Sequence, residues 1–215
     1  MAKMRNEQDN RLDGKIVIFA TGNQDKLREI RNILSDYTDK VLSMKEAGVQ
    51  PTIEENGTTF MANAIIKAQT VAEAVAEAGI KAVVLADDSG LEIDHLGKEP
   101  GVYSARYMGE DTSYRIKNQN LLERLYGVPK EERTARFVCA IAAVLPEGKV
   151  LTTQGTMEGY IGYEEQGGNG FGYDPIFMLP EYDRTSAELS PDLKDAISHR
   201  GQALRAMKDQ LVDYL

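Results

Sequence analysis

The sequence predicts an α/β fold, because apolar segments typical of buried strands alternate with a segment of helical periodicity. Residues 15–20 and 81–86 are short apolar runs rich in β-branched side chains, a composition typical of buried strands. Between them, residues 59–78 are rich in alanine and place apolar side chains at helical spacing. We therefore expect a sheet flanked by helices. Residues 15–215 would form a single domain, which can have two lobes.

The first strand, residues 15–20, leads into a turn and then a helix with its apolar side chains at near-helical spacing. These side chains are Leu27, Ile30, Ile33 and Leu34. A strand, a glycine-containing turn and a helix start make the geometry of a phosphate site, because the free N–H groups there attract anions. Lys26 would add a positive charge. An ordinary capped helix start, with Asn23 or Asp25 as the cap, explains the same residues, so both interpretations stay open.

A second short strand is expected at residues 41–44, and an acidic turn follows it. Glu54 and Glu55 come shortly before the helix expected at residues 59–78, which Thr59 can cap. By themselves, two glutamates in a turn are typical of a solvated loop.

Two adjacent carboxylates, Asp87 and Asp88, follow the strand at residues 81–86. The end of a strand is where α/β folds place their chemistry. Burying an ionised carboxylate is costly unless it is paired or binds a metal. Since Ser89 and Gly90 come next and are ordinary turn residues, the stretch is either an exposed turn or part of a site.

The second half of the chain predicts a loop, a helix and a hairpin. Residues 97–107 form the loop, residues 112–125 the helix, and residues 133–145 a strongly apolar strand that should be central in the sheet. Residues 150–159 alternate in polarity and are the expected hairpin partner. The one cysteine, Cys139, lies in the apolar strand and is expected to be a core residue.

A segment rich in glycine and aromatic residues follows at residues 167–177. Its glycines allow the backbone to approach another group closely, and Phe171 or Tyr173 could present a ring to a flat ligand. A flexible loop that ends in an aromatic core anchor is the alternative. A helix should then start at Ser190, stop near residues 198–201 and be followed by a C-terminal helix over residues 201–215.

Composition and charge limit the function further. The 215 residues are 42% hydrophobic and 27% charged, as in an ordinary globular protein. A net charge of −9 argues against a nucleic-acid polymer as partner, but not against a small phosphorylated ligand. One cysteine and two histidines are too few for a Cys/His metal cluster. No apolar run is long enough for a membrane span, the polar residues 1–14 do not resemble a secretion signal, and a cytoplasmic location is expected.

Six motifs together resemble the inosine triphosphate pyrophosphatase family, the dITP/XTP pyrophosphatases. They are TGNxxK at residues 21–26, EENGTTFxxNAxxKA at 54–68, ADDSGLEID at 86–94, PGVYSARY at 100–107, GNGFGYDPIF at 169–177 and AELSPDLKDAISHRGQAL at 187–204. The resemblance covers residues 16–204, with the motifs in the family's order. It implies an elongated mixed sheet flanked by helices, with two lobes, a central cleft and a homodimer. It also implies Mg²⁺-dependent hydrolysis of dITP, ITP and XTP to the monophosphate and pyrophosphate.

The resemblance assigns roles to individual residues. The triphosphate would be bound by Thr21, Gly22, Asn23, Gln24, Asp25 and Lys26, although the family often has glycine at the position of Asp25. Glu54 and Asp88 would hold Mg²⁺. Asp88 matches the proposed general base, with Asp87 close by, Lys26 assisting and Ser89 in contact with the substrate. The purine would be recognised by Phe171, Gly172, Tyr173, Asp174, Lys194, His199 and Arg200.

Three alternatives are weighed against this interpretation. A Maf-type nucleotide pyrophosphatase shares the architecture and acts on other nucleotides, but the SHRG and FGYDPIF segments favour the first family. A non-catalytic nucleotide sensor would be expected to have lost a metal ligand, and a structural module leaves the acidic turns unexplained. Which of Asp87 and Asp88 takes the proton is not decided by the sequence.

Overall fold

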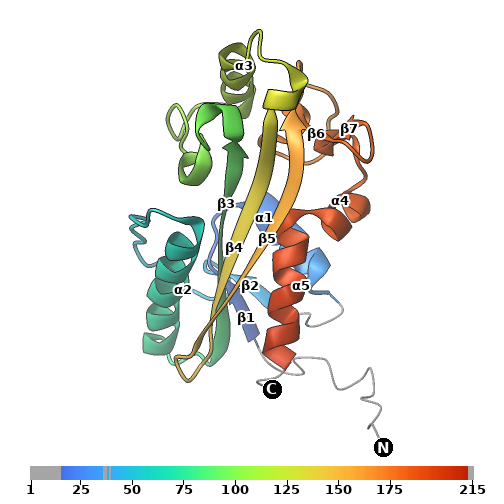
Figure 1. Ribbon diagram of the computed structural model, residues 1–215. Helices are drawn as coiled ribbons and strands as arrows, with labels where there is room; N and C mark the ends of the chain where they lie inside the picture. Colours follow the sequence, from blue (N-terminus) through green and yellow to red (C-terminus); the bar gives the residue numbers. More distant parts are fainter. Residues whose placement is uncertain (1–15, 36–37, 39, 213–215) are drawn as a thin grey trace, which may run out of the picture. The chain divides into compact units, whose positions relative to one another are not determined.

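A computed structural model describes residues 16–35, 38 and 40–212, and within them the chain forms a mixed seven-stranded sheet (Figure 1). The hydrogen-bonded order of the strands is β2-β1-β3-β4-β5-β6-β7. The first strand, β1, is parallel to β2 and β3, whereas β6 is antiparallel to β5 and β7, so the sheet is mixed as expected. The strands are β1 (Ile16–Phe19), β2 (Val41–Ser43), β3 (Ala82–Ile93), β4 (Thr134–Val144), β5 (Val150–Ile161), β6 (Phe177–Leu179) and β7 (Arg184–Thr185).

Each of the first four α-helices starts at a side-chain cap. They are α1 (Gln24–Ile33), α2 (Phe60–Glu77), α3 (Tyr114–Arg124) and α4 (Pro191–Ile197), and α5 (His199–Val212) follows. The caps of α1 and α2 are Asn23 and Thr59, as the sequence allows. None of the helices in the described ranges is long and apolar enough to cross a membrane. The polar leader expected at residues 1–14 lies outside the described residues.

The chain divides into two compact units, in agreement with the two lobes that the resemblance implies. Unit 1 holds the described residues up to Asp87, Ala140–Gln154 and the described residues from Ala203 onward. Unit 2 holds Asp88–Cys139 and Gly155–Gln202. The three long strands β3, β4 and β5 each contribute residues to both units.

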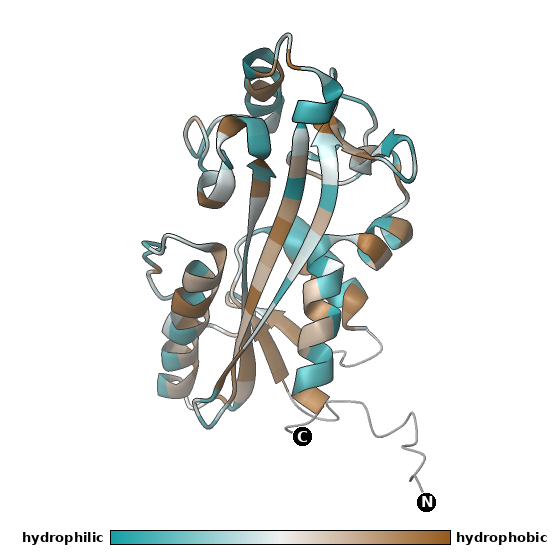
Figure 2. Ribbon diagram, viewed as in Figure 1, coloured by the Kyte–Doolittle hydropathy of each residue, from teal (hydrophilic) through white to brown (hydrophobic). Residues whose placement is uncertain are grey.

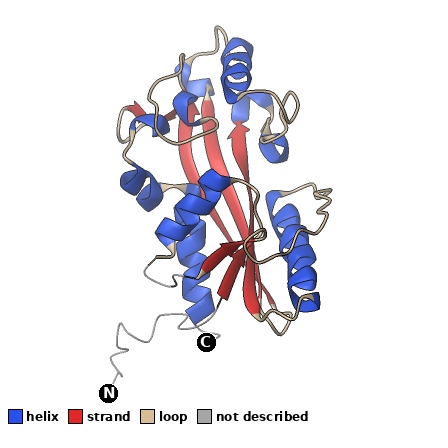
Figure 3. Cartoon of the chain, turned by 180° about the vertical axis from the view of Figure 1, so that it is seen from behind, coloured by secondary structure: helices blue, strands red, loops and turns tan. Residues whose placement is uncertain are grey.

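In unit 1, helices cover the strands on both sides. Helix α2 lies on one side, and α1 and α5 lie on the other (Figures 1 and 3). The strands β1 and β2 are almost wholly apolar (Figure 2), and Val17–Phe19 are fully buried. Helix α2 contributes small side chains to the same core, including Ala64, Ala68 and Val71. Cys139, which belongs to unit 2, is buried as expected.

In unit 2, the core is an apolar cluster from the ends of the long strands, helix α3 and the segments around β6. Its members include Leu91, Leu121, Phe137 and Phe177. The guanidinium of Arg133 is buried beside this cluster and donates hydrogen bonds to the carbonyl oxygens of Leu125, Ile161 and Gly162.

Two elements extend beyond the bounds expected from the sequence. Asp87, Asp88, Ser89 and Gly90 lie inside the continuous strand β3 and do not form a turn. As an inner strand between β1 and β4, β3 gains ladder hydrogen bonds by continuing, and this outweighs the turn preference of these residues. The last helix begins at His199, two residues earlier than expected, because the Ser198 hydroxyl accepts a hydrogen bond from the N–H of Gly201 and caps it.

A hydrogen-bonded carboxylate ties α1 to β2 in unit 1. One oxygen of Glu46 accepts from Arg31 at 2.6 Å and from the N–H and hydroxyl of Ser43 at 2.7 and 2.8 Å. These bonds, the one from Arg31 first, lower the pKa of Glu46 from 4.5 to about 2. A carboxyl with a lowered pKa in the folded state stabilises the protein above its unfolded pKa and loses that effect as the pH falls through the folded pKa.

We therefore expect Glu46→Gln to be less stable than the wild type at neutral pH, and the difference to disappear on acidification. Urea unfolding of both proteins between about pH 6 and about pH 2 measures it. The difference should shrink from pH 4.5 down to about pH 2. A difference that stays constant over this range would contradict the assignment.

Candidate functional site

The segment Thr21–Lys26, at the start of α1, is a capped helix start in this structure. The side chain of Asn23 accepts hydrogen bonds from the N–H groups of Asp25 and Lys26 at 2.9 and 3.2 Å. Within the described chain, the N–H groups of Gly22 and Gln24 have no acceptor, so they are the amides that a phosphate would meet here. The carboxylate of Asp25 pairs with Arg28 at 2.9 Å, which offsets its negative charge.

Two lysines converge on Asp87 in unit 1. The Lys26 ammonium lies 2.9 Å from a carboxylate oxygen of Asp87, whose side chain is 1% exposed. The Lys67 ammonium donates to the backbone carbonyl of Asp87 at 3.1 Å and pairs with Glu55 at 2.9 Å. The neighbouring ammonium group offsets the free-energy cost of removing the Asp87 carboxylate from water.

The acidic loop before α2 is fixed by a close contact with that helix. The buried side chain of Asn63 accepts from the N–H of Gly57 at 2.8 Å. A Cβ at Gly57 would lie 2.6 Å from this Asn63 oxygen, so only glycine allows the approach. Glu54 is exposed in this loop, and its carboxylate forms no hydrogen bond or ion pair within the described part of the chain.

The donor chemistry of Glu54 and Asp88 fits Mg²⁺. Both are hard carboxylate ligands, and Mg²⁺ binds through one or two carboxylates together with waters and substrate phosphates. No group of three or more His, Cys, Asp or Glu side chains that could hold a metal occurs among the described residues. Mg²⁺ held by these two carboxylates would take its remaining ligands from water and substrate phosphates.

The part of β3 that belongs to unit 2 begins with Asp88 and Ser89. We call Asp88–Leu91 the carboxylate segment. Asp88 is 8% exposed, and one of its oxygens accepts from the N–H of Ser89 at 3.1 Å. The hydroxyl of Ser89 lies 3.2 Å from the guanidinium of Arg200, which therefore contacts the strand next to Asp88. Since Asp87 and Asp88 are consecutive, β3 joins the residues around Lys26 to those around Arg200 through the chain itself.

The aromatic segment, Phe171–Asp174, forms a tight turn around the carboxylate of Asp174. One oxygen of Asp174 accepts from the N–H of Phe171 at 2.8 Å and from the Lys194 ammonium at 2.7 Å. The other oxygen accepts from the Ser186 hydroxyl at 2.7 Å. The side chains of Asp174 and Lys194 are 4% and 6% exposed, so this is a buried ion pair.

Two cations face the ring of Phe171. The Lys194 ammonium lies 5.0 Å from the ring centre and the Arg200 guanidinium 5.7 Å from it. His199 is also buried, and its ring stacks on Phe137 at 4.9 Å with an interplanar angle of 12°. Unit 2 thus gathers Ser89, the aromatic segment, Lys194 and Arg200 into one contact network, while His199 packs on Phe137.

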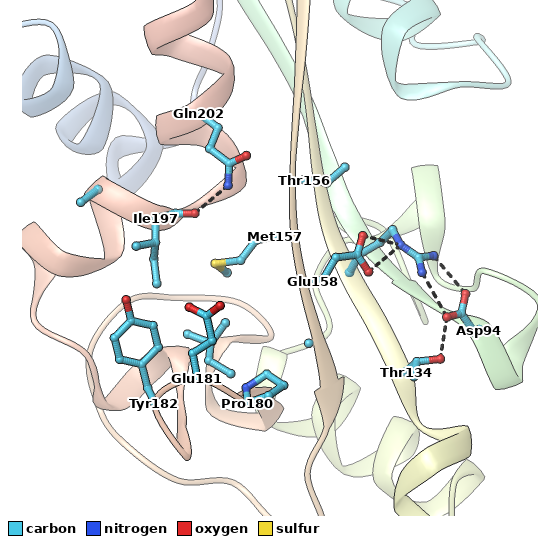
Figure 4. Close-up of a pocket in the computed structure, with 14 residues that line it drawn as sticks. Asp94, Thr134, Thr156, Met157, Glu158, Pro180, Glu181, Tyr182, Ile197 and Gln202 are labelled. Carbon is cyan, nitrogen blue, oxygen red and sulfur yellow. Dashed lines mark hydrogen bonds and ion pairs between the residues drawn. The ribbon is translucent and has the colours of Figure 1, made fainter.

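A pocket of about 840 Å³ in unit 2 lies apart from these residues. Its lining includes an ionic group, in which Arg136 binds Asp94 at 3.0 Å and Glu158 at 2.9 Å, and an apolar group with Met157 and Ile197 (Figure 4). Hydrogen bonds from Arg136, Lys98 and Thr134 hold the pKa of Asp94 well below its usual range. None of the residues predicted for the site lines this pocket.

Sequence reasoning did not assign Lys67 to the site. Its contacts place it beside the predicted residue Asp87 and beside Glu55. The available signal was its position in α2, four residues after Asn63 and so on the same helix face as the residue that holds the acidic loop.

Comparisons with known proteins identify the family of this chain. The model of the Ham1 family matches residues 17–210. A dITP/XTP pyrophosphatase of Bacillus subtilis (strain 168) is 47% identical over 197 residues, which are 92% of this chain and 97% of that protein. A dITP/XTP pyrophosphatase of Clostridium tetani is 45% identical over 94% of this chain and 98% of that protein. The solved structure of a HAM1 protein from Coxiella burnetii matches with a TM-score of 0.81 and 41% identity, over 93% of this chain and 99% of that one.

These matches extend over nearly the whole chain, at identities far above those at which a shared family is in doubt. They confirm the resemblance drawn from the six motifs. This chain therefore belongs to the Ham1 family.

Proposed function

We propose that this protein hydrolyses noncanonical purine nucleoside triphosphates, namely dITP, ITP and XTP, to the nucleoside monophosphate and pyrophosphate. The relatives named dITP/XTP pyrophosphatases support the activity. The observation that carries the proposal is that β3 holds three consecutive polar residues with cations at both ends. Lys26 binds Asp87, and Arg200 binds Ser89.

The phosphate end of the substrate would be bound by unit 1. The amides of Gly22 and Gln24 and the ammonium of Lys26 supply hydrogen-bond donors and positive charge at a helix N-terminus. Lys67 would add a second positive charge beside Asp87. Glu54 and Asp88 would hold Mg²⁺, which supplies charge neutralisation to a bound triphosphate.

Asp88 is the better candidate for general base. It matches the general base proposed for the family, whereas its neighbour Asp87 forms an ion pair with the Lys26 ammonium at 2.9 Å. Asp88 would accept the proton of the water that attacks the α-phosphorus. The bond from the α-phosphorus to the bridging oxygen breaks, and pyrophosphate leaves with that oxygen.

The purine end would be bound by unit 2. The ring of Phe171 offers a flat apolar face, and Lys194 and Arg200 lie near it as hydrogen-bond donors. Inosine and xanthine carry a 6-oxo group that accepts such a bond, whereas adenine carries an amine there. A donor left unpaired against adenine costs ~1–3 kcal/mol, which favours the oxo bases.

Pyrophosphate release from ITP, XTP, GTP, ATP and a pyrimidine triphosphate tests the proposal directly. With Mg²⁺ present we expect pyrophosphate as the first product, and kcat/KM at least about tenfold higher for ITP and XTP than for ATP. EDTA should abolish turnover. Orthophosphate as the first product, or equal rates on ITP and ATP, would overturn the proposal.

A sensor that binds these nucleotides without hydrolysing them is the second candidate. The intact Glu54, Asp87, Asp88 and Lys26 argue against it, because the loss of one such residue is enough to end catalysis. We also propose that the protein acts in the cytoplasm as a homodimer, as the family resemblance implies. Light scattering measures the mass in solution, and a monomer would contradict the second part.

A further inference from the structure

The loop between β3 and α3, residues 100–107, has no role in the proposed mechanism, yet it contacts both substrate segments of unit 2. We propose that Ser104, in this loop, and Tyr173 are positioning residues that hold the aromatic segment, Phe171–Asp174, at a fixed place relative to the carboxylate segment, Asp88–Leu91. This inference rests on the proposed function and adds to it residues that set how the purine is held.

Ser104 fixes the loop to β3. Its hydroxyl accepts from the N–H of Leu91 at 2.9 Å and donates to the carbonyl of Gly101 at 2.6 Å, and the residue is 4% exposed. Leu91 lies three residues after Asp88 and two after Ser89 in the same strand. The hydroxyl therefore holds the backbone of the strand that carries the proposed base.

Tyr173 fixes the aromatic segment to the same residue. Its hydroxyl donates to the backbone carbonyl of Ser104 at 2.7 Å, in a bond that is buried. The ring of Tyr173 meets that of Tyr114 edge to face, with the centres 5.2 Å apart. Burial raises the pKa of Tyr173 far above its ordinary value, so its hydroxyl is a hydrogen-bond donor at every working pH.

One residue, Ser104, thus contacts both segments. The turn Phe171–Asp174 has two kinds of strong anchor, the buried ion pair of Asp174 with Lys194 and the hydroxyl bond of Tyr173. The bond from Asn118 to the carbonyl of Gly172 is longer, at 3.3 Å. Without the Tyr173 hydroxyl, the ring of Phe171 would be positioned mainly from the Lys194 side.

The helix that follows the loop holds it in place. The Lys117 ammonium donates to the carbonyl of Ala105 at 2.6 Å, and the Tyr107 hydroxyl donates to Asn120 at 2.7 Å. Lys117 and Asn120 both belong to α3. The loop is therefore attached to this helix at Ala105 and Tyr107, which follow Ser104 in the sequence. Because α3 holds the loop, the loop can fix the position of the aromatic segment relative to β3.

The test compares Tyr173→Phe and Ser104→Ala with a matched control, Thr153→Val. Thr153, in unit 1, also has a buried hydroxyl that donates to a backbone carbonyl, that of Ala203 at 2.9 Å, but it contacts neither segment. Tyr173→Phe and Thr153→Val each lose one buried hydrogen bond and should show similar losses of thermal stability, whereas Ser104→Ala loses two. Tyr173→Phe keeps the ring, so it should fold even where Ser104→Ala does not.

Steady-state pyrophosphate release from ITP and ATP gives the deciding readout. For Tyr173→Phe and Ser104→Ala we expect KM for ITP to rise by about fivefold with a smaller change in kcat, and the preference for ITP over ATP to fall. Thr153→Val should keep the wild-type KM and preference.

The outcomes separate this inference from the proposed function. A wild type that releases pyrophosphate from ITP, with a Tyr173→Phe variant that keeps its KM and preference, overturns the positioning role alone. A wild type that releases no pyrophosphate from ITP or XTP overturns the proposed function and the inference with it. A raised KM and lowered preference in Tyr173→Phe, with Thr153→Val unchanged, supports both.

Discussion

Replacing Asp88 with asparagine should lower kcat for dITP by about 10²–10⁴-fold, the usual contribution of a general base. Asparagine has the same shape and keeps an oxygen that can accept from the N–H of Ser89, as Asp88 does at 3.1 Å. It cannot accept the proton of the attacking water and is a poorer Mg²⁺ ligand. Pyrophosphate release under saturating dITP measures the effect, and urea unfolding should show a folded protein.

Asp183→Asn is the matched control for this variant. Asp183 is exposed and has φ = 49°, a left-handed conformation that asparagine adopts readily. The same chemical change there should leave kcat unchanged. If Asp88→Asn keeps kcat within about twofold of the wild type, Asp88 is not the base. The parallel substitution Asp87→Asn then tests its neighbour.

The regular elements could be predicted from the sequence because local patterns specify them. The alanine-rich helix α2 and its cap Thr59 follow from spacing and side-chain chemistry, and the structure confirms both. The stretch Asp87–Gly90 shows the limit of that approach. Its residue types favour a turn, but its place between two strands of the sheet keeps it extended, and that place depends on residues far away in sequence.

The site residues could be predicted by type but not by partner. The sequence marks Lys26, Asp87 and Lys194 as candidates, yet it does not show that Lys26 binds Asp87, which is 61 positions further along the chain. Nor does it show the bond from Tyr173 to the carbonyl of Ser104, because a backbone acceptor leaves no trace in residue identity. Such pairings depend on how the chain folds, which the residue types alone do not show.

The buried ion pair of Lys194 and Asp174 should make Lys194→Met one of the most destabilising single changes in unit 2. Its ammonium lies 2.7 Å from Asp174, and both side chains are almost fully buried. Removing one partner of such a pair leaves an uncompensated charge in the interior, which lowers the free energy of unfolding by ~3–5 kcal/mol. The purine would also lose a hydrogen-bond donor beside Phe171, so the preference for ITP over ATP should fall.

A second substitution shows whether the uncompensated charge is the cause. Asp174→Asn in the Lys194→Met background removes the charge and keeps one oxygen for Ser186 or the N–H of Phe171, so it should recover part of the lost stability without restoring the preference for ITP.

Arg28→Met is the matched control, because it breaks an exposed ion pair with Asp25 and should cost at most about 1 kcal/mol. If Lys194→Met proved no more costly than Arg28→Met, the Asp174 charge would have to be compensated without Lys194. A double variant that is no more stable than Lys194→Met would instead assign the loss to the missing lysine side chain itself, and the ion pair would then matter for the purine rather than for the fold.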